Sequence, residues 1–137
     1  MKKRIEAGMI LIALFSCQYH NQLSSDNALT KRIETEFKTE SEVIDLTQLN
    51  SFEWNELLIL GPYCVIEHIE KDLDLDLDNI RGNRIEYSDD INLLIFLNNG
   101  NSVKISEISR GIGDFTDLQR IIERDRGQIR KNSTWPE

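Results

Sequence analysis

Cys64 and His68 are the two residues whose types and spacing could support nucleophilic chemistry. Cys64 follows the Gly61-Pro62 pair, and His68 comes four residues later. A helix dipole lowers the pKa of a thiol at the helix start, and a histidine one turn on could act as its base. A small thiol enzyme or hydrolase that uses Cys64 with His68 is therefore one hypothesis. The alternative, which we favour, is that Cys64 is a buried apolar residue and His68 a surface residue.

The segment DLDLDLD at residues 72–78 offers four carboxylates at alternate positions. A helix-loop-helix calcium loop that starts at Asp74 needs glycine at its sixth position and glutamate at its twelfth, but Asn79 and Ile85 stand there. In an extended chain, carboxylates two residues apart lie about 6.6 to 6.8 Å from one another, too far to share one ion. We therefore expect a solvated face with the leucines turned inward. A weak response to divalent cations through Asp72 to Asp78 is the alternative.

Three residues near the Gly61-Pro62 pair are candidate binding residues: Trp54, Tyr63 and Cys64. Aromatic side chains could line a pocket there, and free N–H groups at the start of the next helix could bind a carboxylate or a phosphate. The alternative is that these aromatic side chains fill the core. The sequence contains no glycine-rich phosphate loop, serine elbow or zinc motif, so we expect no catalytic constellation, no metal site and no cofactor.

Hydrophobic spacing and turn residues predict the elements that must position these residues. Asn99-Gly100 favours the positive φ angles of a tight hairpin turn, and Pro62 suits the first position of a helix. Residues 43–49 are compatible with strand or helix and stay unassigned. The predicted elements are a helix over 28–38 capped by Asp26 or Asn27, a strand over 52–60, a helix from Pro62 that carries Val65, Ile66, Ile69 and Leu73, and a hairpin of strands 91–97 and 102–108.

The chain after the hairpin is predicted to be a further helix over residues 115–129. Thr116 and Gln119 have the spacing of a capping box, and Asp114 is an alternative cap. The apolar residues that define its one face are Phe115, Leu118, Ile121 and Ile122. Together these elements predict an α+β fold, in which one small antiparallel sheet that includes the β-hairpin packs against two or three helices.

The N-terminus combines positive charge with a short apolar run, MKKRIEAGMILIALFSC. Three basic residues, 2–4, precede the apolar stretch of residues 7–16. That stretch is shorter than the roughly 20 residues that a membrane-spanning helix needs. The pattern is typical of a secretory signal peptide.

The end of this run resembles the lipobox of bacterial lipoproteins. Leu14 and Ser16 stand three residues and one residue before Cys17, as in that family, whereas Phe15 departs from the residue usual there. The resemblance covers the first 17 residues and implies cleavage before Cys17, with two or three acyl chains on that cysteine. Such chains would hold the protein at a membrane surface. By the same resemblance Gln18, which is not aspartate, favours the outer membrane where there is one.

Length and charge limit the remaining possibilities. The chain has 137 residues with a formal net charge of −8, which fits one acidic domain and argues against nucleic-acid binding. If Cys17 begins the mature chain, Cys64 is a lone thiol and no internal disulfide can form. The predicted organisation is a signal peptide over 1–16, a lipidated tether over 17–27, a single α+β domain over 28–131 and a frayed tail over 132–137.

These observations predict a membrane-tethered envelope lipoprotein that acts as a non-enzymatic binding or interaction module. Its expected location is the cell membrane or the outer membrane, anchored by lipid on the exported side. The expected partners are the membrane, through the anchor, and another protein of the envelope, which the acidic surface would steer if that protein is basic.

Overall fold

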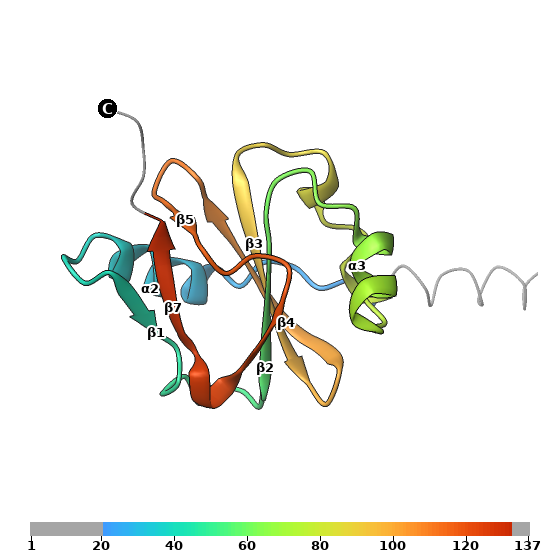
Figure 1. Cartoon of the computed structure of the whole chain (residues 1–137), viewed down its shortest axis with the longest axis horizontal. Coiled ribbons are helices and arrows are strands. Elements are labelled where there is room, and N and C mark those ends of the chain that lie inside the picture. Colours follow the sequence, from blue (N-terminus) through green and yellow to red (C-terminus); the bar gives the residue numbers. More distant parts are fainter. Residues whose placement is uncertain (1–20, 133–137) are drawn as a thin grey trace, which may run out of the picture.

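A computed structural model describes residues 21–132 of the chain (Figure 1). The predicted signal peptide, Cys17 and residues 133–137 lie outside this range. The predicted α+β class is confirmed, with two antiparallel sheets rather than one. The elements are α2 (Asn27–Phe37), β1 (Val43–Asp45), β2 (Glu56–Leu60), α3 (Ile66–Leu73), β3 (Ile91–Asn98), β4 (Asn101–Ser109), β5 (Asp114–Phe115), β6 (Ile121–Glu123) and β7 (Gln128–Asn132), with short 3₁₀ helices η1 (Asp78–Ile80), η2 (Arg84–Glu86) and η3 (Arg124–Arg126).

The centre of the molecule is a four-stranded antiparallel sheet in the order β4-β3-β2-β6. Its middle strands, β2 and β3, are hydrophobic along nearly their whole length and are buried on both faces. Successive residues of a strand point to opposite faces, so each strand supplies side chains to two separate cores. Leu57 and Phe96 enter one core, whereas Leu58 and Ile95 enter the other. Such continuous hydrophobic runs are typical of strands covered on both sides.

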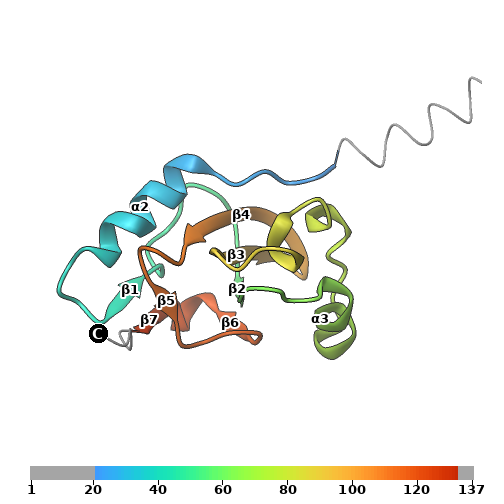
Figure 2. The ribbon, with the colours of Figure 1, turned by 90° about the horizontal axis from the view of Figure 1, so that it is seen from above.

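The first face of this sheet is covered by α2 and by a second sheet in the order β1-β7-β5 (Figure 2). Leu29 and Ile33 pack inward from α2, while Ile44 and Ile129 come from the paired strands β1 and β7. Lys131 joins β7 to the end of α2. Its ammonium donates to the carbonyl oxygens of residues 36 and 39, at 2.6 and 3.1 Å. A positive charge is favourable at that end of a helix.

The second face is covered by α3 and by the segment 75–88 that follows it, on the side of the sheet opposite α2 (Figure 2). Leu77, Ile80 and Ile85 of this segment are fully buried against the sheet. The chain therefore needs a long irregular segment, not just one helix, to cover this face.

The predicted hairpin and first helix are both confirmed. Strands β3 and β4 are joined by Asn99 and Gly100, whose φ angles of 50° and 82° are those that a type I′ turn needs. Helix α2 begins after Asp26, whose carboxylate accepts a hydrogen bond from the N–H of Leu29 at 3.0 Å. The same carboxylate pairs with Lys104 at 2.8 Å, so this cap also joins α2 to β4.

The predicted strand and helix around Pro62 are both shorter than expected. The strand begins at Glu56 rather than at residue 52, and the helix begins at Ile66 rather than at Pro62. Tyr63 has a left-handed backbone with φ of 58°, which prevents a helix from running through that position. The prediction that Pro62 opens the helix is therefore wrong, because a turn separates the two elements.

The predicted C-terminal helix is wrong. Residues 115–129 contain the end of β5, strand β6, η3 and the start of β7. Gln119 adopts a left-handed φ of 60° and donates its N–H to the carbonyl oxygen of Ile59 at 2.8 Å, so it closes no capping box. Ile121 and Ile122 pair with β2 instead. These contacts are far apart in the chain, and helical spacing of apolar residues could not reveal them. Residues 43–45, from the unassigned stretch, form β1.

The predicted tether and tail are in part built into the fold. Residues 21–26, here called the leading segment, lie along the outer edge of β4 and beside η1. Ser25 pairs with Ile105 in parallel, and the N–H of Leu23 donates to the carbonyl oxygen of Asn79 at 2.8 Å. This pairing covers a strand edge that would otherwise be open. At the other end, Asn132 belongs to β7 and pairs with Asp114.

The double contact of Asp26 gives a test of the fold. Asp26→Ala removes the helix cap and should lower the free energy of unfolding by about 1 kcal/mol at neutral pH. Asp26→Asn keeps a capping oxygen but loses the charge pair with Lys104, so its loss should be smaller. Urea unfolding measures both, with exposed Glu53→Ala as control. Equal stability of Asp26→Ala and the wild type would contradict the cap.

The same residue predicts a pH dependence. Hydrogen bonds from Lys104 and then from the N–H of Leu29 hold the pKa of Asp26 below its ordinary 3.8. A carboxyl with a lowered folded-state pKa stabilises the protein above its unfolded pKa, and that stability is lost as the pH falls through the folded-state pKa. The stability gap between wild type and Asp26→Ala should therefore narrow below pH 3.8. A gap that stays constant down to acid unfolding would contradict this.

Candidate functional site

The corner between β2 and α3 is held in place by the turn at residues 85–88. The N–H of Tyr63 donates to the carbonyl oxygens of Ile85 and Ser88, at 3.0 and 3.2 Å. The N–H of Ile66, at the start of α3, donates to the carboxylate of Glu86 at 2.7 Å. Two segments 20 or more residues apart are therefore fixed side by side. The sequence suggested that free N–H groups at this helix start could bind an external carboxylate or phosphate. In the structure, the N–H of Ile66 binds the protein's own Glu86 instead.

Cys64 lies in this corner but is not activated there. The residue is buried, and burial, followed by the negative charge of Glu86, raises the pKa of its thiol. A nucleophilic cysteine needs the opposite shift. His68 is exposed, and within residues 21–132 no hydrogen bond joins it to Cys64. The structure thus gives Cys64 the properties of a buried apolar residue and does not bring these two side chains together as a catalytic pair.

Trp54 is part of the core rather than of a binding surface. Its indole N–H donates to the carbonyl oxygen of Leu49 at 2.8 Å, and its ring meets Phe96 edge-on with centroids 5.1 Å apart. Arg124 covers the indole with its guanidinium 5.0 Å from the ring centroid. Trp54 and Cys64 were candidate binding residues, but both are buried, so neither side chain is part of an exposed binding surface.

Tyr63 is the one candidate binding residue at the surface. Its side chain is exposed, with 59% of the residue accessible to solvent, although its backbone is left-handed. For a bulky L-residue that conformation costs on the order of 1 to 3 kcal/mol, whereas glycine adopts it freely. The fold itself would therefore be served as well by glycine. The exposed ring of Tyr63, rather than its backbone, is therefore the part of this residue that is accessible to a partner.

Three other residues with exposed apolar side chains belong to the same corner: Val65 follows Tyr63 in the sequence, and Tyr87 and Leu118 come from segments that contact the corner. Tyr87 is 82% exposed and sits between the two residues whose carbonyl groups bind the N–H of Tyr63. Leu118 lies against Gly61, where an added β-carbon would come within 3.1 Å of its Cδ1. We call the four residues the tyrosine surface: Tyr63, Val65, Tyr87 and Leu118. Sequence reasoning missed Tyr87 and Leu118 as surface partners of Tyr63, because no motif marks Tyr87 and Leu118 was placed on a helix that does not exist.

Carboxylates dominate the immediate surroundings of the tyrosine surface. Glu67 follows Val65 on α3, and Glu86, Asp89 and Asp90 flank Tyr87. Arg84 pairs with Asp90 at 3.3 Å, and the guanidinium of Arg110 donates to the carbonyl oxygen of Asp89 at 3.0 Å. Hydrogen bonding from Ser88 and then the charge of Arg84 lower the pKa of Asp90, although desolvation opposes them. Acidic residues therefore outnumber basic ones beside the apolar residues of the tyrosine surface.

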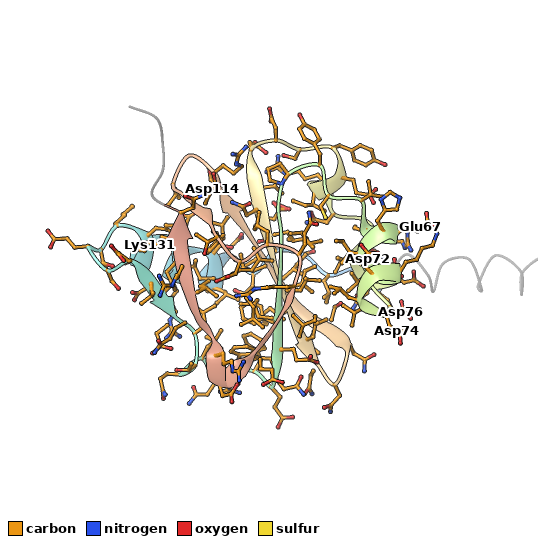
Figure 3. The ribbon with its side chains drawn as sticks, viewed as in Figure 1. Glu67, Asp72, Asp74, Asp76, Asp114 and Lys131 are labelled. Carbon is orange, nitrogen blue, oxygen red and sulfur yellow. The ribbon has the colours of Figure 1, made fainter. Side chains whose placement is uncertain are left out.

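The aspartate run is the solvated face that its alternation predicts. All four aspartates are exposed, Leu73 and Leu75 are half-buried, and Leu77 is fully buried. Helix α3 ends where Asp74 turns left-handed with φ of 54°. Figure 3 shows the side chains of Glu67, Asp72, Asp74 and Asp76 around this end of the molecule.

One acidic cluster nevertheless lies close to this run. Carboxylate oxygens of Glu70, Asp76 and Asp78 come within 4.8 Å of one another. The guanidinium of Arg81 already binds two of the three, Glu70 and, at 3.0 Å, Asp78. These contacts, with Asp78 first, raise the pKa of Arg81. A divalent cation that used all three carboxylates would have to displace this arginine from two of them.

An open hollow of about 750 Å³ lies beside the cluster. Its lining residues are Asn21, Gln22, Asp76, Asp78, Asn79, Arg81, Gly82, Asn101 and Ser102. Most of these polar groups bind one another: Gln22 bonds to residues 78 and 82, and the amide of Asn79 donates to the carbonyl oxygen of Ser102 at 2.8 Å. The hollow is therefore chiefly the place where the leading segment joins the domain.

Searches against protein-family models, curated proteins and solved structures gave no match to this chain. Between residues 21 and 132, no helix has the length and hydrophobicity that crossing a membrane requires. The arrangement of the described residues can therefore be interpreted only from its own chemistry. That chemistry is a buried thiol with a raised pKa, an acidic cluster partly paired with Arg81, and an exposed aromatic surface with acidic residues beside it.

The state of Cys64 is open to direct measurement. In a Cys17→Ala variant, Cys64 is the sole thiol, and burial with a raised pKa should make its alkylation at neutral pH at least tenfold slower than in urea-unfolded protein. Mass spectrometry of iodoacetamide adducts over time gives both rates. Native labelling as fast as unfolded labelling would contradict the buried thiol and restore the Cys64 and His68 hypothesis.

Proposed function

We propose that this protein is a non-enzymatic binding module of the cell envelope, anchored by lipid on Cys17, that binds another protein through the tyrosine surface. The observation that carries the proposal is Tyr63, which is strained and exposed beside the still more exposed Tyr87. The lipid anchor rests on the lipobox resemblance of Leu14, Ser16 and Cys17. The corresponding location is the cell membrane or the outer membrane, on the exported side.

The composition of the tyrosine surface suits protein binding. Tyrosine is enriched at interfaces and in their energetic centres, because it buries a large area while losing few side-chain degrees of freedom. Isolated exposed apolar residues are common and need no explanation, but here the N–H of Tyr63 binds the turn that carries Tyr87, and Leu118 lies against Gly61, so these exposed residues come from one corner of the fold. Residues around such a centre form a polar rim, as the four carboxylates do here.

The reactive alternatives are supported less well. Burial raises the pKa of Cys64, which opposes a thiol enzyme, and Arg81 already binds two of the three carboxylates of the acidic cluster, which opposes a cation-responsive role. The acidic balance of the chain opposes nucleic-acid binding. The exposed side chains of Tyr63 and Tyr87 therefore support a binding role better than these groups support the alternatives.

Site-specific photocrosslinking tests this proposal. A benzophenone side chain placed at position 87 in the full-length protein, expressed in its own cells, should yield a discrete adduct on illumination. The same probe at Lys38, which is exposed at the far end of α2, is the matched control. Adduct from position 87 and not from position 38 is the expected result. Absence of any adduct at 87, or equal adducts at both positions, would contradict the proposal.

A variant of Tyr63 separates binding from folding. Tyr63→Gly removes the side chain and relieves the left-handed strain, so the free energy of unfolding should stay equal or rise by up to about 1 kcal/mol. Loss of an aromatic group from the centre of an interface typically weakens binding by more than 1 kcal/mol, so the adduct from position 87 should fall at least fivefold. A full adduct yield with Tyr63→Gly would remove Tyr63 from the binding surface.

A further inference from the structure

We infer that the partner is a protein with a basic contact surface that is itself held at the membrane to which this protein is anchored. The inference rests on the proposed function and names the class of partner. It follows from how closely the leading segment ties the folded domain to Cys17, together with the charge around the tyrosine surface.

Gln22 fixes the point at which the chain meets the domain. Its side-chain amide donates to the carbonyl oxygen of Asp78 at 2.8 Å and accepts from the N–H of Gly82 at 2.7 Å. Gly82 permits this close approach, because an added β-carbon would lie 3.1 Å from the same amide oxygen. Leu23 follows with its backbone bond to Asn79 and packs against the second core. The domain is therefore joined firmly to the chain only five residues after Cys17.

Chain length then sets the greatest height of the tyrosine surface. The five Cα-to-Cα steps from Cys17 to Gln22 span at most about 18 Å when the chain is fully extended. Gly82, bound to Gln22, is a further five residues from Tyr87, which adds at most about 18 Å. Including the hydrogen bond itself, Tyr87 can lie no more than about 40 Å from the lipidated residue.

A binding surface that stays within about 40 Å of the membrane is best suited to a partner held at the same distance from it. Anchoring two proteins to one membrane makes their encounter effectively intramolecular, and the gain depends on tethers short enough to keep the surfaces together. A partner that diffuses freely would gain nothing from so short a connection. The geometry therefore favours a partner that lies within about 40 Å of the bilayer surface.

The charges identify the kind of surface that this partner presents. Four carboxylates, those of Glu67, Glu86, Asp89 and Asp90, lie on the segments that carry Val65 and Tyr87, and they outnumber the basic residues that contact Asp90 and Asp89, which are Arg84 and Arg110. Basic groups on the partner would complement this rim and accelerate association. The same carboxylates would be repelled by anionic lipid headgroups, which makes insertion of Tyr63 and Tyr87 into the bilayer itself unfavourable.

The test lengthens the connection without touching the surface. A flexible insert of 20 glycine and serine residues between Gln18 and Tyr19 is expressed with the photocrosslinking probe at position 87. Effective concentration falls roughly as the −3/2 power of tether length, so the adduct should decrease about tenfold. The matched control appends the same 20 residues after Glu137 and should leave the adduct unchanged. Membrane pelleting confirms that each form remains anchored.

The outcomes separate this inference from the proposed function. Adduct that survives the insert at full yield shows a partner that is not confined to the membrane, which overturns the inference and leaves the binding module intact. Absence of adduct in the unaltered protein overturns the proposed function itself. Crosslinks to lipid rather than to protein show that the bilayer is the occupant and overturn the inference.

The charge of the partner is tested on the unextended protein. Asp89→Lys reverses one exposed charge of the rim, and it should reduce the adduct several-fold if the partner is basic. Asp72→Lys makes the same change on the aspartate run and is the control. Equal yields from the two variants, or a gain with Asp89→Lys, would overturn the basic partner.

Discussion

The rest of the structure depends on the need to keep water from both faces of β2 and β3. These strands carry hydrophobic side chains at every position from Leu57 to Leu60 and, apart from Asn92, from Ile91 to Leu97, so alternate residues point to opposite faces. One layer cannot cover both. Helix α2 with the three-stranded sheet covers one face, and α3 with residues 75–88 covers the other. Each face forms its own core, which explains how 112 described residues maintain a stable sheet without a disulfide.

This constraint also creates the surfaces on which function is proposed. The chain must leave the sheet abruptly after Leu60 to reach its second face, and Tyr63 occupies the left-handed position of that exit. The covering segment must later return to β3, and its return places Tyr87 beside the exit. The open edge of β4 needs a partner as well, and the leading segment supplies it at Ser25 and Asp26. The same packing thus exposes an aromatic group and brings the folded domain close to the proposed lipid anchor.

The sequence could predict what local chemistry determines. Asn99-Gly100 specifies its turn, Asp26 specifies a helix start, and the alternation of residues 72–78 specifies which side chains meet water. The C-terminal helix could not be judged in this way, because Ile121 and Ile122 owe their conformation to pairing with β2, more than 60 residues earlier. The same distinction between local and long-range determinants applies to the candidate site. Tyr63 could be chosen from the sequence because it follows Gly61-Pro62. The turn that carries Tyr87 contacts Tyr63 only through tertiary hydrogen bonds, which the sequence does not show. Trp54 and Cys64 are buried by long-range packing, which no short motif reveals.

The most direct measurement is the height of the tyrosine surface above the membrane. A dye attached at Tyr87→Cys in a Cys64→Ser background, with Cys17 acylated and the protein on vesicles that carry acceptor-labelled headgroups, reports this distance by energy transfer. The predicted result is a distance within about 40 Å, as the short connection through Gln22 requires. A distance well beyond this limit, or recovery of the protein without acyl chains on Cys17, would contradict a domain that works close to its own membrane.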